Sequence, residues 1–315
     1  MNGLQTLKQW RTFFDQPTKG ILGTMNAMYP VGKIFGVALS AFLGDRFGRK
    51  VPLYTGLSIL LLGAALQGAA KNLPMFIIAR LILGFGTAFI AQTSPILITE
   101  LAYPTHRGIV TSLYFSTYVS MPDVRYFCPS NLVTDHSTMQ YIGAIIAAWT
   151  TYGTFRIPNN YAWRIPSILQ AAIPFGQICL AWVVPESPRW LVANGRTEQA
   201  RRVLVTYHGA GDNTSPLVAF ELKEIEESIK LERIANSQTS WFDLFKGAAN
   251  RRRTAIAGIV GFYGSWTGNA VISYYLVLIL RTIGIDDTPS QALVNGLLQV
   301  FNFLCSVVAG KIEEC

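Results

Sequence analysis

Three short motifs combine acidic and basic residues directly beside uncharged apolar runs. They are GDRFGRK at 44–50, ELAYPTHRG at 100–108 and PESPRW at 185–190. Carboxylate and guanidinium groups next to helix ends form ion pairs with one another and interact with the helix dipoles. The motifs predict a cluster of charges at one face of the molecule, made of Asp45, Arg46, Arg49, Glu100, Arg107, Glu186 and Arg189.

Such a charge cluster supports two interpretations. It can act as a latch that is closed in one conformational state and broken in another. It can also be interfacial charge that only anchors the topology of a membrane protein. The chemistry of the residues alone does not separate a latch from an anchor.

Other kinds of chemistry find little support in the residues. No nucleophile and base, and no acid pair or His pair at ligand spacing, indicate catalysis or a metal site, and the four cysteines show no CxxC spacing. The net charge of +8 comes without a basic arm or an aromatic-interleaved basic stripe. We therefore expect no enzyme, no metal, no cofactor and no nucleic-acid partner.

The elements that must position the motifs follow from the distribution of charge. Residues 185–253 carry 20 of the 44 charged side chains, and long stretches elsewhere carry none. A helix of about 20 apolar residues crosses a bilayer. Within the hydrocarbon, backbone N–H and C=O groups can form hydrogen bonds only with one another, so each span is expected to be helical. The sequence predicts an all-α polytopic membrane helix bundle with spans near 21–44, 51–70, 81–99, 136–155, 165–185, 254–280 and 288–310.

Loops between these stretches are alternately rich and poor in Lys and Arg, which places 45–50, 100–108 and 185–253 in the cytoplasm. Within 185–253, Ser215-Pro216 predicts a helix start, followed by apolar residues at helical spacing from Val218 to Ile229. This segment is either a solvated connector or a regulatory domain. Inside the spans, Gly32 and Gly36 form a GxxxG step that predicts close helix packing.

Together the motifs resemble the sugar porter family of the major facilitator superfamily. GDRFGRK resembles the family's loop between spans two and three, ELAYPTHRG its loop between spans four and five, and PESPRW its motif after span six. The stretches AAWTTYGT, WRIPSILQ and SWTGNAVISYYL resemble fungal hexose and lactose-type permeases. The resemblance covers nearly the whole chain.

The resemblance implies twelve helices in two halves, a central sugar site and alternating access. It implies movement of a hexose or disaccharide across a lipid bilayer, expected to be the plasma membrane, by facilitated diffusion or with protons. A sugar site should mix amides, hydroxyls and aromatic rings. The matching residues are Thr267, Asn269, Tyr274, Tyr275 and Asn302. For each of them, helix packing or an interhelical hydrogen bond is the alternative.

Against the family, about seven of twelve spans are present and the chain is truncated at both ends. Residues 1–20 are expected to be a remnant of an outer loop, 21–184 the N-terminal bundle with spans two to six, 185–253 a cytoplasmic helical linker, and 254–315 the start of the C-terminal half with spans seven and eight. We expect impaired transport from such a chain. The rival function is a transporter-like sugar sensor, which binds without transporting.

One segment departs from the family inside the chain. Residues 119–140 interrupt a predicted span with 22 residues that include Asp123, Arg125 and Asp135. Charges of this kind are costly in a helix that crosses lipid. We interpret the segment as an aberrant insertion, with a translated intron as the hypothesis and a true surface insertion as the alternative.

Overall fold

The computed structural model describes residues 4–5, 7–17, 19–106, 134–238, 245–266, 269–285 and 287–313. Over these ranges the regular elements are helices and no strand occurs, so the all-α prediction is confirmed. The chain divides into two compact units, one made of 1–185 with 274–315 and the other of 186–273.

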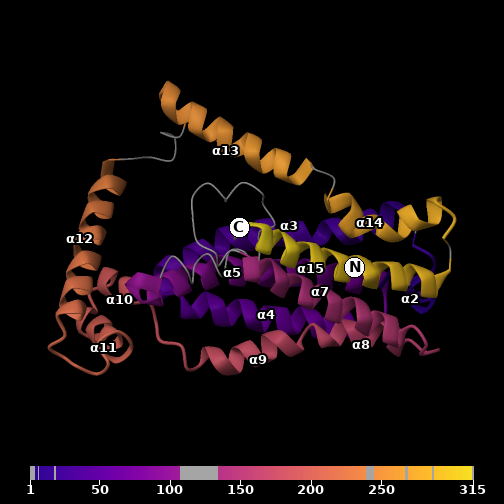
Figure 1. Cartoon of the computed structure of the whole chain (residues 1–315), viewed down its shortest axis with the longest axis horizontal. Coiled ribbons are helices and arrows are strands. Elements are labelled where there is room, and N and C mark those ends of the chain that lie inside the picture. The colour runs from indigo at the N-terminus through magenta and orange to yellow at the C-terminus, as the bar shows by residue number, and fades with distance from the viewer. Residues whose placement is uncertain are drawn as a thin grey trace. The chain divides into compact units, whose positions relative to one another are not determined.

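Three long helices form the centre of the first unit. They are α3 (Lys19–Phe47), α4 (Lys50–Gly68) and α5 (Leu73–Leu101), and both α3 and α4 pack against α5 (Figure 1). By length and composition, the stretches Gly20–Phe47, Lys50–Gly68 and Leu73–Leu101 can each cross a membrane. These helices agree with the first three predicted spans.

The contact between α3 and α5 depends on glycine. A Cβ atom at Gly84 would lie 2.0 Å from the carbonyl oxygen of Tyr29, and one at Gly32 would lie 2.2 Å from that of Leu81. Both distances are far inside van der Waals contact, so only glycine allows the two backbones to approach this closely. The close packing predicted from the GxxxG step is confirmed.

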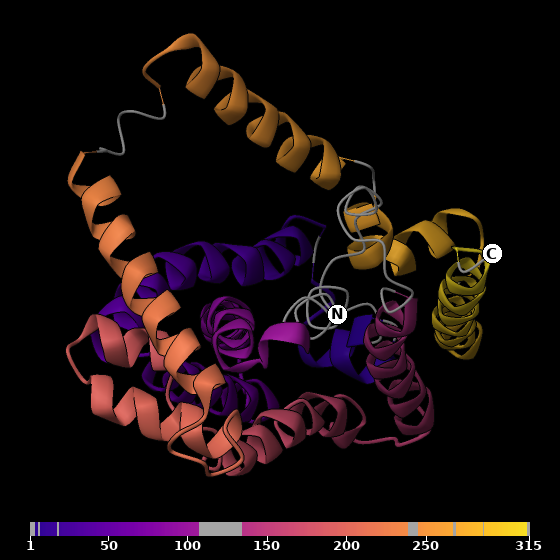
Figure 2. The ribbon, with the colours of Figure 1, turned by 60° about the vertical axis from the view of Figure 1, so that its left-hand side comes forward.

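A second pair of helices in this unit joins distant parts of the sequence. Helix α7 (Thr134–Thr154) packs against α15 (Thr288–Glu313), and the two run side by side in Figures 1 and 2. Helix α7 covers the span predicted near 136–155 and begins inside the segment 119–140 that we interpret as an insertion. Residues 119–133 lie outside the described residues.

The span predicted at 165–185 is not one continuous helix. It is divided into α8 (Tyr161–Leu169) and α9 (Ala172–Ala181). Pro174 has no N–H to donate to the carbonyl of Gln170, and its ring would collide with that carbonyl in a regular helix. The expectation of an unbroken span was wrong, because Pro174 interrupts the hydrogen bonding of the backbone at this point.

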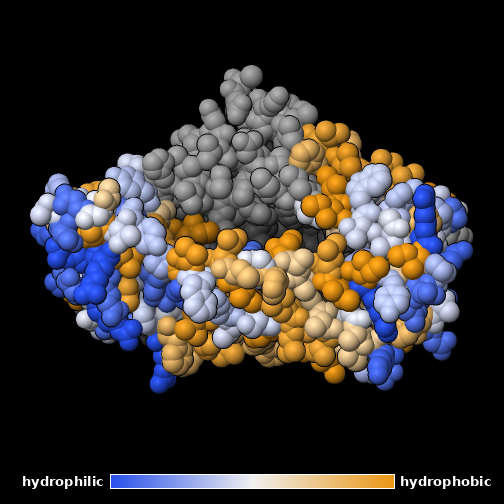
Figure 3. Space-filling model, turned by 90° about the horizontal axis from the view of Figure 1, so that it is seen from below, coloured by the Kyte–Doolittle hydropathy of each residue, from blue (hydrophilic) through white to orange (hydrophobic). Residues whose placement is uncertain are grey.

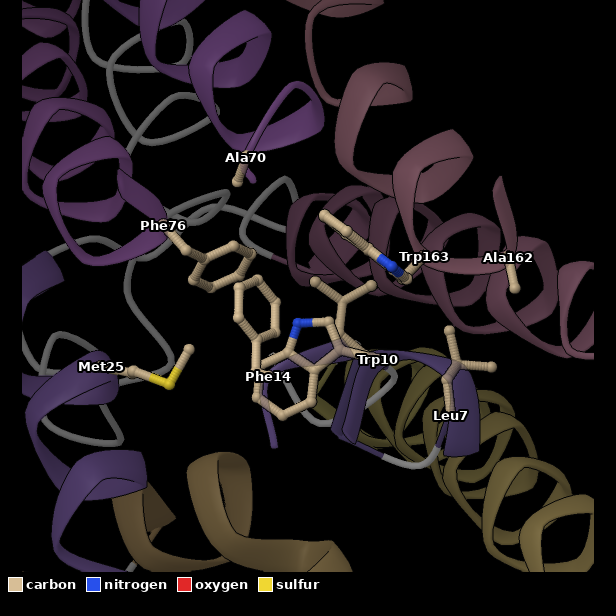
Figure 4. Packing of buried hydrophobic residues seen from close by; sticks show 9 residues of the cluster. Leu7, Trp10, Phe14, Met25, Ala70, Phe76, Ala162 and Trp163 are labelled. Carbon is tan, nitrogen blue, oxygen red and sulfur yellow. The ribbon is translucent and has the colours of Figure 1, made fainter. Parts of the chain in front are cut away.

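An aromatic core closes one end of this unit. Helix α2 (Lys8–Phe13) contributes Trp10, which is fully buried against Phe14 and Phe76, and Trp163 of α8 joins the same cluster (Figure 4). The ring centroids of Phe14 and Phe76 are 5.2 Å apart, at an edge-on angle that aromatic pairs prefer. The segment 1–20, predicted to be an outer-loop remnant, therefore includes a short packed helix.

The surface of the first unit carries the hydrophobic side chains expected of a protein in lipid. Along α8 and α9, Ile168, Phe175 and Leu180 are all more than half exposed, and Figure 3 shows a mainly hydrophobic middle of the face on which these helices lie. Exposed apolar patches of this extent mark membrane or protein contact.

The second unit contains α10 (Pro188–Ala193), α11 (Thr197–Tyr207), α12 (Pro216–Gln238) and α13 (Ala248–Trp266). Helix α12 begins at Pro216 as predicted, and Val218 packs with Leu204 and Val205 of α11 in a small core. Next to this core the buried side chains of His208 and Glu221 form a pair at 2.7 Å. Helix α14 (Asn269–Thr282) starts in this unit and continues into the first.

Candidate functional site

Arg49 lies at the turn between α3 and α4 and joins two carboxylates. Gly48 before it has a φ of 94°, a left-handed conformation that favours glycine. The Nη1 of Arg49 donates to Asp45 Oδ1 at 3.1 Å. Its Nε and Nη2 donate to the two oxygens of Glu100 at 3.3 Å and 3.4 Å, which is a two-point, fork-like contact.

The two carboxylates differ in their exposure to solvent. The side chains of Arg49 and Glu100 are 17% and 11% exposed, whereas that of Asp45 is 82% exposed. Burial lowers the pKa of Arg49, but the charge of Glu100 and the hydrogen bonds to Glu100 and Asp45 raise it further, so the net pKa lies above its usual value. The guanidinium is therefore held in its charged form by Glu100 above all.

The other four residues of the predicted cluster are not joined to this bridge by any described contact. Arg46 lies over the ring of its neighbour Phe47. Arg107 lies outside the described residues. In the second unit, Glu186 accepts a hydrogen bond from the backbone N–H of Ser187 at 2.9 Å.

Arg189, also in the second unit, finds partners on α12. It donates to the hydroxyl of Ser228 at 3.3 Å and forms an ion pair with Glu232. Glu232 could not be predicted as this partner, because no local signal links two residues 43 positions apart. The described ion pairs of the predicted cluster are thus Asp45–Arg49–Glu100 in the first unit and Arg189–Glu232 in the second.

Two of the five predicted sugar-site residues have described side chains, Tyr275 and Asn302. Tyr275 interrupts α14 with non-helical torsion angles (φ −125°, ψ 16°), and its hydroxyl lies 4.0 Å from the position a Cβ would take at Gly23 of α3. Asn302 is partly buried on α15. We find no hydrogen bond between the described side chains of Tyr275 and Asn302.

The remaining three sugar-site candidates are less defined. Asn269 and Tyr274 lie on α14, and only their backbone is described. Thr267 lies outside the described residues. A break within a helix is typical of substrate sites in transporters, because it frees backbone groups near the middle of the membrane. The kink at Tyr275 is therefore the feature that best supports a site on α14.

A polar cluster between α3 and α5 was not predicted as a unit. The ring of Tyr29 has Lys33 Nζ at 4.9 Å and Arg80 Cζ at 5.7 Å, and its hydroxyl donates to Thr87 Oγ1 at 3.2 Å. Arg80 is only 8% exposed. Charged residues within spans are by default candidates for function. The two cations were visible in the sequence, but nothing there indicated the tyrosine between them.

The groove between α4, α5 and α9 offers little to a sugar. It has a volume of about 450 Å³ and is lined mainly by apolar side chains such as Leu57 and Leu97, with Ser94 and Gln177 as its polar residues. A sugar carries several hydroxyl groups that need hydrogen-bond partners, so this groove is better suited to lipid tails.

The sequence matches a known family over most of its length. The family described as "Sugar (and other) transporter" matches residues 1–120 and 128–313. The residues left out, 121–127, fall within the predicted insertion at 119–140. Whether that whole segment is an insertion stays a prediction.

Individual relatives are transporters from fungi. The chain is 31% identical over 281 residues to the MFS-type transporter oryC of Aspergillus oryzae, covering 86% of this chain and 47% of that protein. It is 29% identical over 287 residues to a low-affinity glucose transporter of Saccharomyces cerevisiae, covering 90% and 46%. The chain spans about half the length of the curated relatives it matches.

Solved structures agree on the fold. The proton:xylose symporter XylE superposes with a TM-score of 0.72 at 21% identity, covering 98% of this chain and 64% of that one. A partially occluded, inward-open form of XylE from E. coli gives a TM-score of 0.57 at 18% identity, covering 99% and 82%. With the family match over both halves of the sequence, the chain belongs to the sugar transporter family of the major facilitator superfamily.

Proposed function

We propose that this chain takes part in moving a sugar across a membrane by alternating access. The observation that carries the proposal is the family match, which extends over both the motif-bearing helices and the kinked α14. Relatives named as glucose transporters favour a hexose as the substrate. Their names give no support to the rival function of a sensor that binds without transporting.

We propose a latch role for the ion pair between Arg49 and Glu100. It joins the turn after α3 to the last turn of α5, so any relative movement of these helix ends must break it. Its two-point geometry and partial burial make it stronger than an exposed ion pair, yet it remains an ion pair that water can replace. Arg189 with Glu232 is a second candidate latch within the other unit.

For the sugar itself we propose Tyr275 and Asn302, with Thr267, Asn269 and Tyr274 as further members. A phenolic hydroxyl and an amide supply donors and acceptors for sugar hydroxyls, and the tyrosine ring supplies an apolar face. Tyr275 is supported most directly, because it lies at the kink of α14 with its hydroxyl directed toward the glycine-bearing start of α3.

Three further points belong to the same proposal. The half-buried Lys33 and the buried Arg80 beside Tyr29 are consistent with coupling to protons, and one structurally similar protein is a proton:xylose symporter. We place the protein in the plasma membrane, where a hexose carrier meets its substrate. We also keep residues 185–253 as a cytoplasmic linker between two halves, supported by their charge and by the soluble-type core of α11 and α12.

Uptake of radiolabelled glucose in yeast cells without their own hexose carriers tests the proposal. Two proteins are compared: the 315-residue chain, and a chimaera in which the Saccharomyces glucose transporter supplies the length that the chain does not span. We expect saturable uptake from the chimaera, reduced at least tenfold by Tyr275→Ala, and weaker uptake from the chain itself.

Tyr263→Ala is the matched control, because Tyr263 lies exposed on α13 and is not a proposed sugar residue. Saturable glucose binding with no uptake by either protein would contradict transport and favour a sensor. Equal uptake by the Tyr275 and Tyr263 variants would contradict the assignment of the sugar site to α14.

A further inference from the structure

Two adjoining cavities lie between α2 and the end of α14 in the first unit. The larger, of about 340 Å³, is lined by Lys8, Arg11, Thr12, Gln16 and Arg281. The smaller, of about 240 Å³, shares Arg11, Gln16 and Arg281 with it. The shared residues make the two cavities one continuous candidate site, distinct from the proposed sugar residues.

The charge lining this site has one sign. Lys8, Arg11 and Arg281 contribute three cationic groups, and none of the described residues that line either cavity is acidic. Cations gathered around one cavity repel one another, and a bound anion relieves that repulsion. The electrostatics of the cavity therefore favour a negatively charged ligand.

Hydrogen-bond donors in the site point the same way. Gln5 is only 3% exposed and lines the smaller cavity, and its Nε2 is buried without a hydrogen-bond partner. The Nη2 of Arg281 is likewise buried and without a partner. Buried donors that lack an acceptor are unfavourable, so a ligand with several acceptor oxygens would satisfy groups that the protein leaves open.

The remaining walls are apolar. Trp10, Leu22 and Val277 line the smaller cavity beside the donors. Such walls exclude water, which strengthens the interaction of the cationic groups with an anion. They also provide contact for an apolar group attached to that anion.

We propose that this cavity binds a phosphate group, held by Arg281 and Lys8 with Gln5 as an additional donor. A guanidinium group matches phosphate oxygens at two points, and a lysine ammonium adds a compact charge. The phosphate can belong to a phospholipid headgroup or be the free ion, and the shared recognition chemistry is the same. The site is remote from the Arg49 bridge, because Leu22 and Asp45 are separated by about 35 Å along α3.

Binding to the full chain, purified in a maltoside detergent that contains no phosphate, tests the proposal. Radiolabelled inorganic phosphate is measured by equilibrium dialysis, and phosphatidic acid and phosphatidylcholine by native mass spectrometry. We expect one bound phosphate-bearing molecule per chain. Arg281→Gln and Lys8→Gln should each weaken its binding at least tenfold, and Arg281→Lys should retain part of it.

Lys71→Gln is the matched control, since Lys71 is an exposed cation that lines neither cavity. Binding of inorganic phosphate that the two variants lose supports the free ion, and binding of the lipids alone supports a headgroup. The proposal is overturned if wild-type protein binds none of the probes, or if the cavity variants bind within twofold of Lys71→Gln. Thermal melting of every variant shows which are folded. If Arg281→Gln does not fold, the proposal is judged on the binding measured for Lys8→Gln, which changes an exposed side chain.

Discussion

Arg49 meets both carboxylate oxygens of Glu100, at 3.3 Å and 3.4 Å, across 51 positions of sequence. The contact ties the turn between α3 and α4 to the last turn of α5. Because both side chains are mostly buried, removal of Arg49 would leave the Glu100 carboxylate buried without this partner. In this conformation the pair therefore stabilises the fold. A latch movement must supply the free energy needed to break it.

Removing the guanidinium should destabilise this state. Arg49→Gln is expected to lower the free energy of unfolding by about 2 kcal/mol, because Glu100 loses two charge-assisted hydrogen bonds while remaining buried. Thermal unfolding of the purified protein in detergent measures the effect. Asp45→Asn is the control, since its 82% exposed carboxylate should contribute less than about 1 kcal/mol. An Asp45 effect as large as that of Arg49 would contradict the dominant role of Glu100.

The pKa of Arg49 predicts how the bridge responds to alkali. Glu100 and Asp45 raise this pKa above its usual value despite the opposing effect of burial. A raised folded-state pKa gives stability that is fully present below the unfolded-state pKa and is lost only as the pH rises through the folded value. Between about pH 7 and pH 10 the stabilisation by Arg49 should therefore stay constant.

Melting temperatures of wild type and Arg49→Gln, measured across that pH range, check the prediction. The two curves should remain parallel, with the difference between them unchanged. A difference that shrinks steadily toward pH 10 would mean that Arg49 loses its charge within the range.

The pair between Arg189 and Glu232 should behave differently from the Arg49 bridge. Its side chains are 37% and 58% exposed, so Glu232→Gln is expected to change stability by less than about 1 kcal/mol. If the pair acts as a latch, sugar uptake by the chimaera should still change by severalfold. The matched control is Glu227→Gln, because Glu227 is a similarly exposed carboxylate of α12 that pairs with Lys223 of its own helix. Equal uptake by the two variants would argue against a latch at Arg189.

The sugar site makes a prediction about affinity. Tyr275→Phe keeps the ring at the kink of α14 and removes only the hydroxyl group. Loss of one hydrogen bond to the sugar, about 1.4 kcal/mol, should raise the KM for uptake about tenfold with little change in maximal rate. Tyr263→Phe, on an exposed side chain, should leave the KM unchanged. A fall in maximal rate at constant KM would instead assign Tyr275 to the conformational change.

Local patterns predicted some elements well. The start of α12 at Pro216 and the burial of Val218 and Ile229 follow from a cap signal and helical spacing, both of which act within a few residues. The close contact of α3 and α5 followed from the GxxxG step. Each of these features depends on residues that are close together in the sequence, so a local pattern is enough to predict it.

Contacts between distant residues could not be predicted in the same way. Trp10 is buried in a cluster with Phe76 and Trp163, and Arg189 pairs with residues of α12. No pattern near Trp10 or Arg189 indicates these partners. The break before Pro174 is a different case, because its cause was present in the sequence. The apolar length of the segment favoured a continuous span. The helix is nevertheless interrupted, because Pro174 removes a backbone hydrogen bond.

The packing of α3 on α5 gives the sharpest stability prediction. A Cβ at Gly84 would lie 2.0 Å from a backbone carbonyl oxygen of α3, which cannot rotate away as a side chain would. Gly84→Ala must therefore push the two helices apart, at a cost of about 3 kcal/mol or more.

The control is Gly176→Ala on α9, where a Cβ meets nothing within 4 Å and the gain in helix propensity is up to about 1 kcal/mol. Thermal unfolding in detergent should show Gly84→Ala melting well below wild type and Gly176→Ala at or above it. Equal melting temperatures for the two variants would mean that α3 and α5 are not in contact at this glycine.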